Sequence, residues 1–108
     1  MAVWLFIAQR LSALVMAPLV IGHLIVIVLA VQNGLTAEEI LSRTRGSVFW
    51  GAYYGLFVLV AAIHAGIGLR AILSESLPWR GPSLNLFSLA FAGALLLLGG
   101  RAVIAVVA

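Results

Sequence analysis

Hydrophobic residues fill three long stretches of the chain, and two short polar segments separate them. Uncharged residues run from 11 to 31, from 46 to 69 and from 81 to 100. Each run is close to the roughly 20 residues that a helix needs to cross a bilayer. A spanning segment must satisfy its backbone hydrogen bonds internally, so these runs predict helices. We expect an all-α integral membrane bundle, one domain over 1–108, with three transmembrane helices at about 5–31, 47–73 and 84–107.

The two polar segments, 32–46 and 74–83, contain glycine, proline, serine and most of the charged residues. Such composition is typical of turns and loops. Trp50, Tyr53 and Tyr54 open the second run and Trp79 lies in the second polar segment, where interfacial aromatic residues are usual. We therefore expect both segments to be loops at the membrane surface.

Composition agrees with a membrane protein, since 65% of the residues are hydrophobic and 8% are charged. Only about 30 residues remain outside three spans, too few for a soluble catalytic domain. The chain contains no phosphate-binding loop or dinucleotide motif, and its lack of cysteine excludes disulfides and thiolate metal sites. Its six basic residues form no run, so no nucleic-acid partner is expected. Function must lie within the bilayer or at a docking surface.

Ionisable side chains inside a membrane cost about 2.5 to 3.5 kcal/mol each on insertion, which makes them functional candidates. Two histidines lie within the predicted spans, and three arginines lie near span ends: His23, His64, Arg10, Arg70 and Arg101. No acidic residue lies in a span. This argues against a proton-coupled transporter, which needs a membrane carboxylate.

His64 has small neighbours on its own helix face. The positions three, four and seven residues away are Val60, Ala61, Ile67, Gly68 and Ala71. A flat macrocycle can approach a helix that lacks bulky side chains, and imidazole is a common ligand of haem iron. Small residues also allow helices to pack closely, as the Gly51 and Gly55 pair on the same span would. Haem ligation and a hydrogen bond across a helix interface both remain open for His64.

His23 has bulky neighbours instead, and Pro18 one turn earlier is expected to kink the helix and free a carbonyl that a polar group could serve. A packing role is therefore favoured, with ligation of a second haem as the alternative. Counted from Arg10 and Arg70 at one face, His23 lies about 20 Å deep and His64 about 9 Å deep. One iron cannot be held by both, so a second subunit would supply the opposite ligand to His64.

Two roles are possible for the arginines near the span ends. Arg70 and Arg10 could bind haem propionates through charge-assisted hydrogen bonds, or extend to lipid headgroups. Arg101, close to the end of the third run, is expected to be a headgroup anchor. Three basic residues fall on each side of the membrane, so charge does not decide the orientation.

Two stretches of the chain form recognisable motifs: AQRLSALVMAPLVIG (8–22) and HAGIGLRAILSE (64–75). Together they resemble the cytochrome b membrane-anchor subunits of succinate dehydrogenase and fumarate reductase. In that family the first span opens with His-Arg-x-Ser-Gly, and the second ends in His-x-x-x-Gly-Ile-Arg-His with an acidic residue beyond it. The chain departs from the pattern at Gln9 and Ala71, which replace histidines, and at Phe6, which replaces a serine.

The resemblance implies a role for each matching residue. His64 corresponds to the axial ligand of haem b, and Gly68 to the glycine of the same motif. Arg10 corresponds to the quinone-site arginine, with Ser12 and Trp79 as plausible neighbours of the quinone headgroup. Arg70 corresponds to the arginine that ends the second span.

The resemblance also implies partners and a place in the cell. We expect an iron–sulfur subunit, a flavoprotein subunit, a second membrane-anchor subunit and membrane lipid as partners, and no nucleic acid. The chain would help bind haem b, one or two copies shared with a partner, and pass electrons between the iron–sulfur subunit and quinone. The amino terminus and the second loop would face the catalytic subunits, and a bacterial inner membrane is favoured over a mitochondrial one.

Two other functions fit the residues alone. One is a non-redox scaffold or channel subunit that packs through Gly51, Gly55 and the alanine-rich third span. The other is the cytochrome b subunit of a different membrane oxidoreductase, although such subunits usually carry more spans and more histidines. The presence or absence of a haem spectrum separates the first of these from an electron carrier.

Overall fold

The computed structural model describes residues 3–108, and the first two residues of the predicted domain lie outside this part. The described chain contains four helices and no strand: α1 (Val3–Gln32), α2 (Ala37–Thr44), α3 (Val48–Ser76) and α4 (Pro82–Val107). Helices α1, α3 and α4 are long and apolar enough to cross a membrane. The prediction of an all-α bundle with three transmembrane helices is confirmed.

The three long helices contain 30, 29 and 26 residues. At about 1.5 Å per residue they measure about 40 to 45 Å, longer than the hydrocarbon core of about 30 Å. Their ends therefore reach the headgroup regions. Large apolar side chains such as Leu14 and Leu89 are 70% exposed on the outside, as expected of surfaces that meet lipid or partner subunits.

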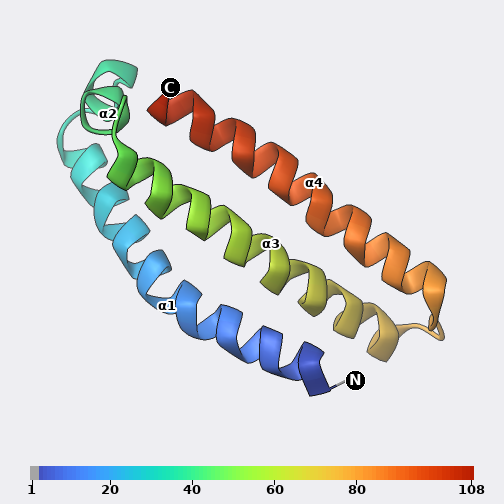
Figure 1. Cartoon of the computed structure of the whole chain (residues 1–108). Helices are drawn as coiled ribbons and strands as arrows, with labels where there is room; N and C mark the ends of the chain where they lie inside the picture. The colour runs from blue at the N-terminus through green and yellow to red at the C-terminus, as the bar shows by residue number, and fades with distance from the viewer. Residues whose placement is uncertain (1–2) are drawn as a thin grey trace.

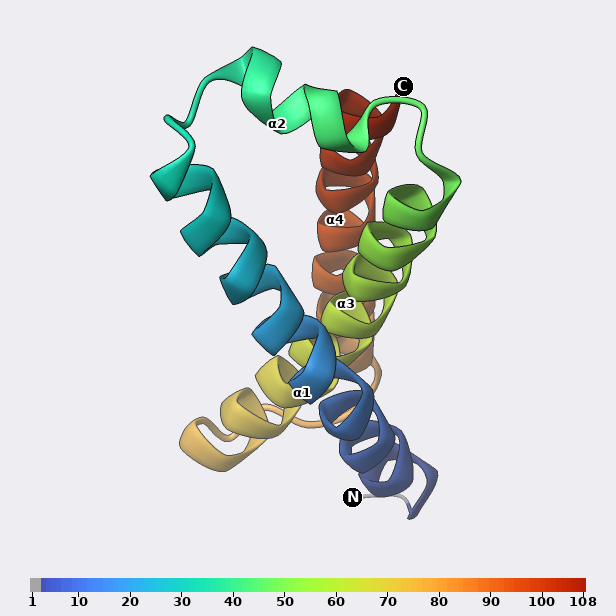
Figure 2. The same ribbon diagram turned by 90° about the vertical axis from the view of Figure 1, so that its left-hand side faces the viewer.

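Helix α3 is the central element, because it packs against both α1 and α4 (Figure 1). The start of α1 and the turn between α3 and α4 lie at one end of the bundle, and α2 and the carboxyl terminus lie at the other. Figure 2 shows that α1 crosses α3 and then diverges from it towards α2. Helices α1 and α3 thus lie close together at their crossing and farther apart near α2.

Small residues bring α3 and α4 together. A Cβ atom built on Gly66 would lie 3.0 Å from the Cβ of Ala92, and one on Gly99 would collide with Val58. A Cβ built on Gly51 would make only an ordinary contact with Val107, and one on Gly55 would meet nothing within 4 Å. Within this chain the close approach therefore uses Gly66 and Gly99, and not the Gly51 and Gly55 pair.

Replacing Gly66 by leucine is expected to destabilise the α3–α4 packing by about 1 to 3 kcal/mol, because the added side chain has no room beside Ala92. Thermal unfolding in detergent should show the loss as a lower midpoint. The matched control is Gly55→Leu on the same helix, where the added side chain enters open space. Equal melting of the two variants would contradict this packing.

The expectation that the whole first polar segment is a loop is wrong, because part of it forms helix α2. The Thr36 side chain caps it by accepting a hydrogen bond from the backbone N–H of Glu39 at 3.1 Å. Glu39 also forms an ion pair with Arg43 at 2.9 Å, one helical turn later. The backbone N–H of Gly46 donates to the carbonyl of Val107 at 2.7 Å and ties this end of the bundle to α4. A capping threonine three residues before glutamate is a helix-start signal in the sequence.

Candidate functional site

The α1–α3 crossing brings His64 and Ser12 together. The Oγ of Ser12 lies 3.1 Å from Nδ1 of His64, and the same hydroxyl donates to the backbone carbonyl of Gln9 at 2.9 Å. Ser12 is buried, with 7% of its surface exposed, while His64 is half-buried. Two motifs that lie 52 residues apart in sequence therefore meet through a hydrogen bond.

The second ring nitrogen of His64 is open. Within residues 3–108 Nε2 makes no hydrogen bond. The buried polar side-chain atoms without a partner in that range are Gln9 Oε1, His23 Nδ1 and Ser88 Oγ, and His64 Nε2 is not among them. Nε2 is therefore not fully buried. It is the ring nitrogen of His64 that no group within residues 3–108 engages.

Gly68 lies one turn beyond His64 and faces α1. A Cβ built on it would lie 3.4 Å from Nε2 of the Gln9 side chain. The glycine thus permits the close passage of Gln9 beside the histidine helix. Ser12, Gln9, His64 and Gly68 form one contact region, which we call the crossing cluster.

The predicted arginines differ in their surroundings. Arg10 is exposed, its guanidinium carbon lies 5.2 Å from the centre of the Phe6 ring, and it has no hydrogen bond or ion pair within residues 3–108. Arg70 is half-buried and donates from Nε to the Oδ1 of Asn85 on α4 at 2.7 Å. Arg101 is exposed near the opposite end of the bundle. Arg10 is therefore free to bind an incoming ligand, whereas Arg70 is partly committed to helix packing.

The turn between α3 and α4 holds the remaining predicted residue. The indole N–H of Trp79 donates to the hydroxyl of Ser83 at 2.8 Å, and its ring centre lies 5.3 Å from that of Phe87. Arg80 donates to the backbone carbonyls of Ser74 and Leu77 at the end of α3. The Trp79 N–H is engaged within the chain, so its ring face is the part that remains for a ligand.

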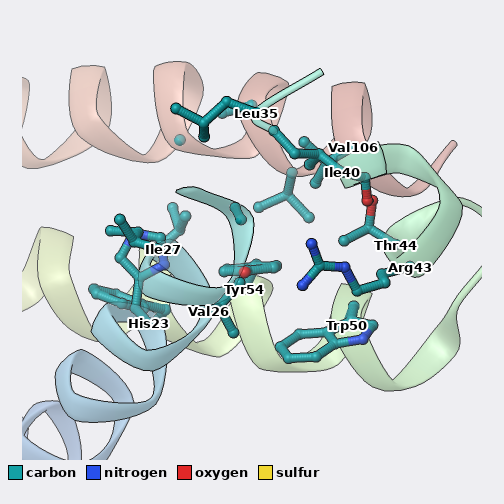
Figure 3. Close-up of a pocket in the computed structure, with 16 residues that line it drawn as sticks. His23, Val26, Ile27, Leu35, Ile40, Arg43, Thr44, Trp50, Tyr54 and Val106 are labelled. Atoms are coloured by element: carbon teal, nitrogen blue, oxygen red, sulfur yellow. The ribbon is translucent and has the colours of Figure 1, made fainter. Parts of the chain in front are cut away.

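His23 lies in a different place, beside a cavity of about 460 Å³ that residues of all four helices line. Its ring packs edge-on against Tyr54 and Phe57, with centre distances of 5.8 and 5.4 Å. Figure 3 shows His23 on one side of this cavity and Arg43 and Trp50 on the other. The Nδ1 of His23 is buried without a partner, so it does not serve a carbonyl freed by Pro18.

The two histidines are at different levels of the bundle. His23 is level with Phe57, which precedes His64 by seven positions, or about 10 Å along α3. That separation agrees with the sequence-based depths. Two ligands on opposite sides of one iron must lie at nearly the same level, so the described chain offers at most one of them to any haem.

Some contacts at the site were not expected from the sequence. Asn85 and Ser88 are neutral polar residues in the third span, so they are not among the ionisable residues singled out from the sequence. Asn85 binds Arg70, and Ser88 is buried against α3, where its carbonyl oxygen lies 3.6 Å from the Cβ built on Gly66. Polar residues within an apolar span are a signal that could have identified both.

The chemistry available to the crossing cluster is that of one imidazole whose Nε2 makes no hydrogen bond within residues 3–108. Within residues 3–108 no group of three or more His, Cys, Asp or Glu side chains could hold a bare metal ion. A haem needs only one imidazole from each side, because the porphyrin supplies the other four nitrogens. The donor set present therefore fits haem better than a protein-only metal site.

The chain matches a known protein family. The family model described as succinate dehydrogenase/fumarate reductase transmembrane subunit matches residues 1–100. No curated protein and no solved structure matches the chain.

Proposed function

Because the chain belongs to the succinate dehydrogenase/fumarate reductase transmembrane subunit family, we propose that His64 is an axial ligand of haem b and that Arg10 helps to bind quinone. Family membership makes the protein an integral membrane subunit of a complex II enzyme, associated with other subunits of that complex. Haem b, quinone and the residues that bind them are proposed beyond what family membership gives.

The observation that carries the haem proposal is the state of the His64 ring. One nitrogen is held by Ser12 inside the chain, and the other is not fully buried and makes no hydrogen bond within residues 3–108. A haem bound there supplies a one-electron carrier within the membrane. Because His23 lies about 10 Å away along the bundle, a second membrane-anchor subunit would provide the opposite ligand.

The chain's arginines would supply positive charge at the same end of the bundle. The Nη groups of Arg70 remain free to bind a haem propionate while its Nε holds Asn85. The free guanidinium of Arg10 would donate to a quinone carbonyl oxygen and stabilise the negative charge that develops there as electrons arrive. The ring face of Trp79 would pack against the quinone headgroup.

The same end is the expected docking face for the iron–sulfur and flavoprotein subunits. It carries Arg10, Glu75, Trp79 and Arg80, whereas α2 and Arg101 lie at the other end. Quinone bound beside Arg10 would then lie close to the electrons that enter from the iron–sulfur subunit. We place this face in the cytoplasm of a bacterial cell.

A haem count on the purified complex tests the proposal. The complex is isolated through a tag on this chain, haem b is measured as the pyridine haemochrome, and flavin is measured in the same sample. We expect one haem b per flavin. A second haem in the count would implicate His23 as well. A complex with flavin and no Soret absorption would contradict haem ligation and leave the chain an anchor without a redox group.

A further inference from the structure

We propose that Ser12 is a positioning residue that fixes the tautomer and the orientation of the His64 ring. The inference rests on the proposed haem ligation by His64 and goes beyond it. The resemblance placed Ser12 beside quinone, whereas in the structure its hydroxyl bridges the Gln9 carbonyl and His64 Nδ1.

A serine hydroxyl carries a single hydrogen and can donate only one hydrogen bond. A backbone carbonyl can only accept, so in the 2.9 Å contact with Gln9 the hydroxyl of Ser12 must be the donor. The hydroxyl oxygen then has only lone pairs for the 3.1 Å contact with His64, and Nδ1 must carry the hydrogen. Nδ1–H therefore donates to Ser12.

A neutral imidazole with its hydrogen on Nδ1 has its lone pair on Nε2. Nε2 is the nitrogen that makes no hydrogen bond within residues 3–108 and that is not fully buried. Ser12 thus holds His64 in the tautomer that can bind iron through Nε2 before any iron binds. Because Ser12 is buried, water does not compete for this hydrogen bond.

The hydrogen bond from His64 to Ser12 also holds the imidazole ring in place and makes it a stronger electron donor to a bound metal. A metal-bound histidine whose other N–H is bound to an acceptor is fixed in orientation and is a more basic ligand, and losing such a partner typically weakens metal binding about 10- to 100-fold. A more basic ligand favours ferric over ferrous haem. Removing the Ser12 oxygen should therefore weaken haem binding and raise the midpoint potential of the haem.

The test compares Ser12→Ala with Ser12→Thr in the whole complex, each judged by haem per flavin, by the haem midpoint potential and by the low-spin ferric EPR signal. Ser12→Ala should lower haem occupancy or raise the midpoint potential of the haem. A tenfold loss in the preference for ferric over ferrous haem corresponds to a rise of about 59 mV. Ser12→Thr keeps a hydroxyl and should resemble the wild type. If the alanine variant does not assemble, Ser12→Cys keeps the volume with a weaker acceptor and should shift the potential in the same direction.

Two results would overturn the inference. One is wild-type haem content, potential and EPR signal in Ser12→Ala or, where that variant does not assemble, in Ser12→Cys. The other is a loss of quinone turnover with unchanged haem properties, which would return Ser12 to the quinone site. Both leave haem ligation by His64 intact, whereas a wild-type complex without haem would defeat the proposed function itself.

Discussion

Replacing His64 by alanine is expected to remove haem b from the purified complex, with at least about a tenfold fall in haem per flavin. The change deletes the imidazole of the crossing cluster, whose Nε2 makes no hydrogen bond within residues 3–108. Loss of an outer contact to a ligating histidine already weakens metal binding about 10- to 100-fold, so loss of the ligand itself should cost no less. The reduced-minus-oxidised spectrum and the pyridine haemochrome measure the result directly.

The chain provides a matched comparison in its second histidine. His23→Ala also removes an imidazole from the bundle, but beside the cavity below α2, where the ring packs against Tyr54 and Phe57. We expect haem to remain in this variant. Unchanged spectra in His64→Ala, or loss of haem in His23→Ala alone, would show that the ligand has been assigned to the wrong residue.

Replacing Arg10 by alanine is expected to slow electron exchange with quinone by about 10- to 100-fold. A hydrogen bond to a charged group is worth about 1.5 to 3 kcal/mol, and each 1.36 kcal/mol corresponds to a factor of about ten in rate. Activity with a soluble electron acceptor should stay unchanged, because that acceptor takes electrons before they reach the membrane subunit. Both activities are measured on the same detergent-purified complex.

The control for Arg10 is Arg101→Ala, which removes an exposed arginine from the opposite end of the bundle. It should leave both activities at the wild-type level. A loss of both activities in Arg10→Ala would indicate failed assembly. Full quinone activity in an assembled Arg10→Ala complex would contradict the quinone role of this residue.

Hydropathy alone predicted the fold class because the bilayer imposes it. A segment that crosses lipid must be long, apolar and internally hydrogen-bonded, and this leaves little choice for the runs that became α1, α3 and α4. Helix α2 was missed because eight residues are too few for a hydropathy signal. Local interactions mark this helix instead: Thr36 caps its start, and Glu39 pairs with Arg43 one turn later.

The contacts between helices could not be predicted in the same way. That Ser12 meets His64 depends on the level at which α1 crosses α3, and no local pattern in either helix specifies it. The same holds for the glycines. Gly51 and Gly55 have the spacing of a packing motif, yet the close approach occurs at Gly66 of α3, which faces Ala92 of α4, and at Gly99 of α4, which faces Val58 of α3.

The most direct measurement is an experimental density map of the assembled complex in the ferric state. We expect a porphyrin against the α1–α3 pair, with its iron in bonding contact with Nε2 of His64 and Nδ1 of the same ring still donating to Ser12. A map in which no porphyrin touches His64, or in which the iron near this chain is held only by other residues, would contradict this expectation.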